Sequence, residues 1–364
     1  MSVRSGHEVT CNRRDFLLRS AAAAGIGGAW LNASAVSAAG DKPNILLIMT
    51  DQQTASAMRC AGNPHLATPA MDALARQGIR FSHAYITQPL CMPSRSSLQT
   101  GRYPHEIGVI SNGRDIRGEF PMLGSLMGNA GYECAYIGKW HVGTSFKSAG
   151  YAGEAYDIRP DHRKTEAAVS RLKRGFREPF FLTVSYMNPH NVCELARGEA
   201  LPDGPIGEPP TEPDALPPLP ENFAIPENEP SAIREVQRKI PFHYPTRDWD
   251  ELKWRQYLWG YYRLVEKVDA EIGRVLDQLR AMGAWENTLI LFASDNGASA
   301  EIMVRGGGHD PAAPPGSAKS YLCLGPGWSS AANTPLRRHK TWVHEGGIAT
   351  PLIVHWPSGI RARG

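Results

Sequence analysis

Short apolar runs recur along the chain and alternate with segments of helical periodicity. Five of these runs are rich in Ile, Leu, Val or aromatic residues, which is typical of strands covered on both faces. They are Asn44–Met49, Cys134–Ile137, Phe180–Ser185, Thr288–Ala293 and Leu352–Trp356. Because alternation of strands and helices favours a mainly parallel sheet with helices on both faces, the pattern predicts an α/β fold.

The longest helical pattern runs from about Trp249 to Met282 and carries a continuous apolar stripe. Asp248 together with Glu251 is a plausible N-terminal cap, and Gly283 ends the pattern. We expect the stripe to lie in the core rather than to form a cofactor site; its members are Val265, Val268, Ile272, Val275, Leu276 and Leu279.

Two shorter helices are predicted from their end signals. The first begins at Thr68 and Pro69 and ends at Gly78, with the cap residue, first-turn proline and terminal glycine in their usual places. The second covers Pro121–Ala130 and is stopped by Gly131. These helices complete the alternation that the fold prediction rests on.

The first 40 residues have the features of an export signal. Arg13 and Arg14 are adjacent, a weakly apolar run follows over residues 21–31, and small residues close the segment near residues 36–38. This pattern favours a twin-arginine signal peptide, with a general secretory signal or a membrane anchor as the alternatives. We therefore expect residues 1–40 to be the signal and residues 41–364 to be one catalytic domain. The protein is expected to be periplasmic or secreted, without stable membrane insertion.

Composition limits the partners. The chain has 364 residues, a hydrophobic content of 42% and a net charge of +3. This charge is too small to indicate nucleic acid or an anionic membrane surface as a partner, so any anion binding must come from a local cluster. Of the six cysteines, Cys11 lies in the signal segment, so the rest of the chain has an odd number of cysteines. No spacing of these cysteines is typical of a zinc site.

A proline-dense stretch covers residues 202–230. We expect a surface insertion in extended conformation. The alternative is that the stretch lines a substrate cleft.

Oxygen-bearing side chains follow two of the predicted strands. Asp51 and Gln52 come after the first strand, and Asp295 and Asn296 follow the strand Thr288–Ala293. Ligands of open α/β sheets bind beyond the carboxyl ends of the strands, and such oxygens suit a hard cation such as Ca²⁺ or Mg²⁺. A turn or helix cap is the alternative at each position, and Gly297 would permit a tight turn.

The most specific signal is a twelve-residue motif that begins at Cys91 and ends at Arg102. The stretch resembles the signature of the sulfatase family within the alkaline-phosphatase-like superfamily, C-x-P-S-R followed by L-x-T-G-R. The matching positions are Cys91, Pro93, Ser94, Arg95, Leu98, Thr100, Gly101 and Arg102. The resemblance covers about Lys42 to Pro357. It implies a large, mainly parallel or mixed sheet sandwiched by helices, with the usual small C-terminal subdomain missing.

The resemblance also implies a chemistry. In the family a formylglycine-generating enzyme oxidises the motif cysteine, here Cys91, to formylglycine (3-oxoalanine), and it reads Pro93 and Arg95. One hydroxyl of the aldehyde hydrate attacks sulfur, and deprotonation of the second expels sulfate and restores the aldehyde. Arg95 would hold the hydrate and its neighbouring groups.

Four further positions match the family in order and spacing. Lys139 and His141 lie in a Gly-Lys-Trp-His segment after the strand Cys134–Ile137. By resemblance, Lys139 contacts a sulfate oxygen and His141 polarises the formylglycine hydroxyl. His190 would protonate the leaving alcohol or bind sulfate, and Lys340 would reach sulfate near the leaving oxygen.

The resemblance implies a metal site formed by Asp51, Gln52, Asp295, Asn296 and the oxygen derived from Cys91. Calcium is the family's usual ion. Many members have a second aspartate where this chain has Gln52, so Mg²⁺ and Mn²⁺ stay open as alternatives.

The predicted reaction is hydrolysis of an organic sulfate, whether aryl, alkyl or carbohydrate, to an alcohol and inorganic sulfate. A sulfated small molecule or a sulfated polysaccharide would be the substrate. A phosphodiester or phosphonate monoester hydrolase on the same scaffold is one alternative. An inactive, truncated sulfatase-like protein is the other, because the sequence stops at Gly364, soon after the last predicted strand.

Overall fold

The computed structural model describes residues 42–155, 160–177, 179–221, 223–224, 227–232, 249–299, 310, 328 and 331–360. The elements below belong to the compact unit Pro43–Gly364. The predicted signal segment, residues 1–40, lies outside the described residues.

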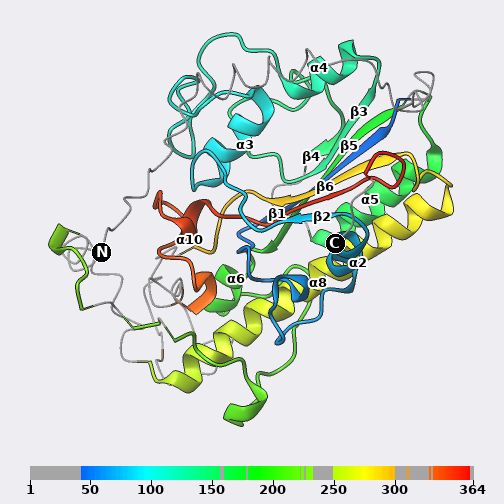
Figure 1. Ribbon diagram of the computed structural model, residues 1–364. Helices are drawn as coiled ribbons and strands as arrows, with labels where there is room; N and C mark the ends of the chain where they lie inside the picture. Colours follow the sequence, from blue (N-terminus) through cyan, green and yellow to red (C-terminus); the bar gives the residue numbers. More distant parts are fainter. Residues whose placement is uncertain are drawn as a thin grey trace, which may run out of the picture. The chain divides into compact units, whose positions relative to one another are not determined.

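A seven-stranded sheet forms the centre of the described unit, in the order β2-β7-β6-β1-β5-β3-β4 (Figure 1). β7 runs antiparallel to β6 and β2, whereas β6, β1, β5, β3 and β4 are parallel. The strands are β1 (Asn44–Asp51), β2 (Ile79–Phe81), β3 (Glu133–Gly138), β4 (Ala152–Ala155), β5 (Phe180–Pro189), β6 (Thr288–Ser294) and β7 (Leu352–His355).

The five predicted strands and the mainly parallel sheet are confirmed. The predicted strands did not include β2 and β4, which have three and four residues. Both are edge strands and neither contains an apolar run, so the periodicity gave no signal for them.

Helices cover both faces of the sheet, as predicted. α2, α5 and α8 lie on one side, and α3 and α4 lie on the other (Figure 1). Side chains alternate across the strands, so Leu46 and Ile48 of β1 enter one core cluster while Leu47 and Met49 enter the other. None of the described helices is long and apolar enough to cross a membrane. The helices are α2 (Pro69–Gln77), α3 (Cys91–Thr100), α4 (Leu123–Asn129), α5 (Asp161–Arg174), α6 (Val192–Ala196), α8 (Glu251–Ala281) and α10 (Glu345–Ile348), with 3-10 turns η1 (Arg59–Ala61) and η2 (Pro213–Ala215).

The long helix α8 is confirmed, but its predicted cap was wrong. The cap is Asp250, whose carboxylate accepts a hydrogen bond from the Lys253 N–H at 2.8 Å. Asp248 lies outside the described residues. The apolar stripe is core, as expected, since all six of its side chains are buried.

The ends of α2 are where they were predicted, for other physical reasons. The Thr68 hydroxyl does not cap the helix. Instead Asp269 of α8 accepts hydrogen bonds from the N–H groups of Ala70 and Met71 at 3.0 and 2.9 Å. Gly78 has φ −129°, so it is not a left-handed terminal glycine. A β-carbon there would lie 2.3 Å from a β7 carbonyl, so close packing of α2 on the sheet explains this glycine.

Candidate active site

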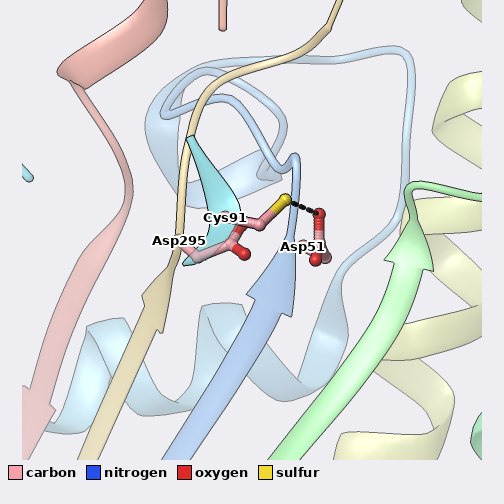
Figure 2. Close-up of side chains that lie close together, drawn as sticks. All are labelled: Asp51, Cys91 and Asp295. Atoms are coloured by element: carbon pink, nitrogen blue, oxygen red, sulfur yellow. Dashed lines mark hydrogen bonds between the residues drawn. The ribbon is translucent and has the colours of Figure 1, made fainter. Parts of the chain in front are cut away.

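The carboxyl ends of the central strands bring the predicted site residues to one edge of the sheet. β1 lies between β5 and β6, so Asp51 at the end of β1 adjoins Asp295, which follows β6. Cys91 is the first residue of α3. Figure 2 shows the side chains of Asp51, Cys91 and Asp295 pointing toward one another.

Cys91 lies among buried oxygen and amide groups. Its Sγ is 3.7 Å from Oδ1 of Asp51 and accepts a contact from Nδ2 of Asn296 at 3.6 Å. The same Asn296 amide donates to Asp295 at 2.6 Å. All four residues are buried. The position that the resemblance assigns to the nucleophile therefore adjoins the position assigned to the metal.

Arg95 lies one helical turn beyond Cys91 and joins the two carboxylates. Its Nε donates to Asp295 at 2.7 Å, and its Nη2 donates to Asp51 at 3.1 Å. Nη1 donates to the Lys139 carbonyl at 2.9 Å and to the Ser185 hydroxyl at 2.8 Å. Every nitrogen of the buried guanidinium thus has a partner, which fixes both carboxylates relative to α3.

Lys139 is delivered by the end of β3. Its Nζ is 2.6 Å from Oδ2 of Asp51, and the residue is 5% exposed. Gly138 before it has φ 110°, and a β-carbon there would lie 1.9 Å from the Ser185 carbonyl. Only glycine fits this approach of β3 to β5. The Tyr136 hydroxyl donates to the Lys139 carbonyl at 2.6 Å and fixes the turn.

Lys340 and His190 complete the cationic side of the site. Lys340 is 2% exposed, and its N–H donates to the Ala298 carbonyl at 3.1 Å. Its charge lowers the pKa of Asp51 and of Cys91, and His190 also lowers the pKa of Asp51.

The environment of the site shifts the pKa values of the two carboxylates in opposite directions. Burial alone would raise the pKa of Asp51, but Lys139, His190, Arg95 and Lys340 together lower it well below its usual range. Burial and the charge of Asp51 raise the pKa of Asp295 to about 6, with Arg95 opposing them.

The donor set fits a hard cation. Ligand atoms of Asp51, Cys91 and Asp295 all lie within 4.8 Å of one another. The Cys91 sulfur stands in for the formylglycine oxygen, since hard cations take oxygen ligands. Two atoms bound to one Ca²⁺ at about 2.4 Å can be at most about 4.8 Å apart, so these three can share an ion. Oδ1 of Asn296 is buried and has no hydrogen-bond partner among the residues that the structure describes. An acceptor left in this state is a ready metal ligand.

Backbone strain marks the same region. In the described part of the chain, positive φ at non-glycine residues occurs at Gln52 (64°), His141 (44°), Arg338 (70°) and Thr341 (80°). Two of these are predicted site residues, and the other two flank Lys340. A β-branched residue such as Thr341 is rare in this conformation, and such outliers cluster at functional sites.

Three supporting residues were missed by the sequence analysis. Ser185 holds Arg95, Tyr136 holds the Lys139 carbonyl, and Tyr261 of α8 donates to the Gln52 carbonyl at 2.7 Å. Ser185 and Tyr136 sit inside apolar runs that were interpreted as strand core. A polar group placed near the carboxyl end of such a run was the available signal.

Gly297 is required for close packing rather than for a left-handed conformation. Its φ is not positive. A β-carbon at Gly297 would lie 1.9 Å from the Gly346 carbonyl. The glycine therefore allows the segment after β6 to pack against α10, next to the loop that carries Lys340.

Comparison with known proteins agrees with this geometry. The family model described as Sulfatase matches residues 43–363. A delta 4,5-hexuronate-2-O-sulfatase of Bacteroides thetaiotaomicron is 29% identical over 286 residues, covering 72% of this chain and 58% of that protein. An ulvan-active sulfatase of Formosa agariphila is 30% identical over 289 residues, covering 70% of this chain and 50% of that protein. The chain thus spans half to three-fifths of the length of these curated relatives.

The fold is shared with solved sulfatases. The structure of a 2-O GAG sulfatase superposes with a TM-score of 0.63 at 24% identity, covering 87% of this chain and 65% of that one. That fold is alkaline-phosphatase-like, as predicted. With a family model that matches nearly the whole described unit, the chain belongs to the sulfatase family.

Proposed function

We propose that the chain hydrolyses sulfate esters to an alcohol and inorganic sulfate, with Cys91 converted to formylglycine as the nucleophile. The observation that carries the proposal is the position of Cys91 at the start of α3, beside buried Asp51 and Asp295 and within a set of buried cations. Membership of the sulfatase family supports the same reaction.

The charge balance of the cluster suits a sulfate ester. Arg95, Lys139 and Lys340 bring three positive charges against the two carboxylates of Asp51 and Asp295, so the site has an excess of positive charge before any metal binds. Groups fixed in this way around a developing negative charge stabilise a transition state strongly, because they need no reorganisation.

The thiol of Cys91 is unsuited to act unmodified. Burial and the charge of Asp51 raise its pKa to about 11, so it is protonated at neutral pH. A protonated thiol is a poor nucleophile. The formylglycine hydrate would supply a hydroxyl in its place, and His141 and His190 are our candidates for polarising that hydroxyl and for protonating the leaving alcohol.

A divalent metal, which we propose to be Ca²⁺ with Mg²⁺ or Mn²⁺ as alternatives, would be held by Asp51, Gln52, Asp295, Asn296 and the modified residue 91. When bound, it would add positive charge and lower the pKa of the attacking hydroxyl. Gln52 is neutral, so the set carries two negative charges. Fewer charged ligands weaken calcium binding, so we expect modest affinity.

We propose a sulfated carbohydrate as the substrate class. The names of two relatives, a delta 4,5-hexuronate-2-O-sulfatase and an N-acetylglucosamine-6-O-sulfatase, support this choice. Modification by a formylglycine-generating enzyme and twin-arginine export to the periplasm or the medium belong to the same proposal. Replacing Arg13 and Arg14 by lysine and comparing the cell fractions tests the export step.

The test of the reaction is a matched set of esters that share one leaving group. Protein co-expressed with a formylglycine-generating enzyme is supplied with an aryl sulfate, an aryl phosphonate monoester and an aryl phosphodiester, and kcat/KM is measured for each. The proposal predicts the highest kcat/KM for the sulfate. A higher value for either phosphorus ester would favour the alternative hydrolase.

A further inference from the structure

The proline-dense segment, residues 202–230, contacts two of the three loops that carry predicted sulfate-binding groups, those of His190 and Lys340. Asp203, near its start, contacts the end of β5, which precedes His190. Glu229, near its end, forms ion pairs with Arg337 and Arg338, which lie three and two residues before Lys340. A plain surface insertion has no need of carboxylates at both of these places.

The first anchor joins Asp203 to Asn188. Asp203 Oδ2 accepts a hydrogen bond from the Asn188 amide at 3.1 Å, and Oδ1 accepts one from the His162 N–H at 3.1 Å. Lys267 of α8 donates to the Asp203 carbonyl at 2.7 Å. The segment thus begins on a fixed base beside the strand end that delivers His190.

The second anchor joins Glu229 to Arg337 and Arg338. Glu229 forms ion pairs with both guanidinium groups, and its side chain is 2% exposed. Arg338 is also well buried at 7% side-chain exposure, whereas Arg337 is 48% exposed. Glu229 and Arg338 hold each other in place, because either of these two left alone would be a buried charge without compensation.

The backbone is strained in the loop that contains Arg337, Arg338 and Lys340. Arg338 and Thr341 have φ of 70° and 80°, and Lys340 lies between them. The backbone is held by Asn333, which donates to the Arg338 carbonyl at 3.2 Å, and by the Gly346 N–H, which donates to the Arg337 carbonyl at 2.7 Å. Strained residues persist only where several contacts hold them in place. Glu229 adds such contacts by holding the side chains of Arg337 and Arg338.

We propose that Glu229 is a positioning residue for Lys340, and that Asp203 and Glu229 anchor the described start and end of the proline-dense segment to the substrate site. The inference rests on the proposed function in one respect, which is that Lys340 binds the sulfate group. It gives the proline-dense segment a role in supporting the site through its two anchors, whereas the alternative drawn from the sequence was that the segment lines the substrate cleft.

The test compares Glu229→Gln with Asp214→Asn. Both changes neutralise one carboxylate in the same segment, but Asp214 lies in the exposed turn η2. Hydrogen–deuterium exchange of the peptide covering residues 335–342 reports on the loop without any need for activity. Titration with inorganic sulfate reports on binding per folded molecule, and kcat and KM for an aryl sulfate report on turnover.

We expect Glu229→Gln to speed exchange in residues 335–342, to weaken binding of inorganic sulfate, and to lower kcat/KM by about tenfold to a hundredfold, with KM raised. Glu229→Asp should fall between Glu229→Gln and the unaltered protein, and Asp214→Asn should match the unaltered protein. If Glu229→Gln does not fold, Arg338→Lys, which keeps the charge but loses the planar fork, takes its place with the same expectations.

Two outcomes overturn the proposal. One is unchanged exchange in the loop after Glu229→Gln. The other is an unchanged affinity for inorganic sulfate together with a fall in kcat that is fully explained by a smaller fraction of folded protein. That result would mean that Glu229 has only a structural role. Failure of the proposed function looks different, because the unaltered protein would then release no sulfate while the exchange difference between the variants remained.

Discussion

Replacing Lys139 by methionine should lower kcat far more than the replacement of a surface lysine would. The change keeps most of the aliphatic stem and removes the ammonium, which is 2.6 Å from Oδ2 of Asp51. Loss of one fixed charge contact in a dry site lowers kcat by about 10²- to 10³-fold. Stability should also fall, by about 3 kcal/mol, because the pair is buried and one partner is lost. This is the lower end of the usual range, since Arg95 still contacts Asp51 at 3.1 Å.

The same replacement should change the pH dependence of metal binding. Burial raises the pKa of Asp51 and Lys139 is the largest of the charges that lower it, so the pKa rises when the lysine is removed. A carboxylate with a higher pKa is protonated at higher pH, and the proton then competes with the cation. We therefore expect Ca²⁺ affinity to weaken on acidification at a higher pH than in the unaltered protein.

The assay is release of inorganic sulfate from an aryl sulfate by protein that carries formylglycine, together with calorimetric titration of Ca²⁺ between pH 5 and 8. Lys147→Met is the matched control, because this lysine is exposed on the loop that follows the same strand. A loss of rate within twofold for Lys139→Met would refute the reasoning and remove Lys139 from the site.

Three further predictions address the nucleophile, the metal and the fold. Cys91→Ala should abolish turnover, and Cys91→Ser should leave at most traces, in the sulfate-release assay. Calcium should raise the melting temperature more at pH 7 than at pH 5, because the pKa of Asp295 is raised to about 6 by burial and protons displace the metal below it. Asp269→Ala should lower the free energy of unfolding by about 1–3 kcal/mol in urea, because it leaves the N–H groups of Ala70 and Met71 without their acceptor.

Each of these has a result that contradicts it. Normal turnover by Cys91→Ala removes the nucleophile from the account. A calcium effect that is equal at both pH values, or larger at pH 5, contradicts the raised pKa of Asp295. For Asp269→Ala, unchanged stability would mean that α2 is capped by other groups, and unchanged kinetics of the folded fraction is the expected control.

The sequence was most informative where one residue decides one local feature. Apolar runs located all the described strands except β2 and β4, and the carboxylates at the ends of two predicted strands identified Asp51 and Asp295. The motif that begins at Cys91 identified the family. These features depend on the residue type and its place relative to a strand end, and both can be read along the chain.

The contacts that hold the site depend on register, which the sequence does not display. Ser185 reaches Arg95 because β5 pairs with β3 so that Gly138 lies opposite Ser185. Asp250 rather than Asp248 caps α8 because it immediately precedes the first helical residue. The cap of α2 comes from Asp269, almost 200 residues away along the chain. Such partners follow from tertiary packing, so local patterns could not reveal them.

The central claim is that residue 91 acts as a formylglycine nucleophile in sulfate ester hydrolysis. The most direct measurement is mass spectrometry of the peptide that spans Cys91, after co-expression with a formylglycine-generating enzyme, paired with sulfate release by the same preparation. The account predicts a peptide lighter by the difference between cysteine and formylglycine, and sulfate release in proportion to its fraction. An unmodified thiol in a protein that releases sulfate, or complete conversion in a folded, metal-loaded protein that releases none, would contradict it.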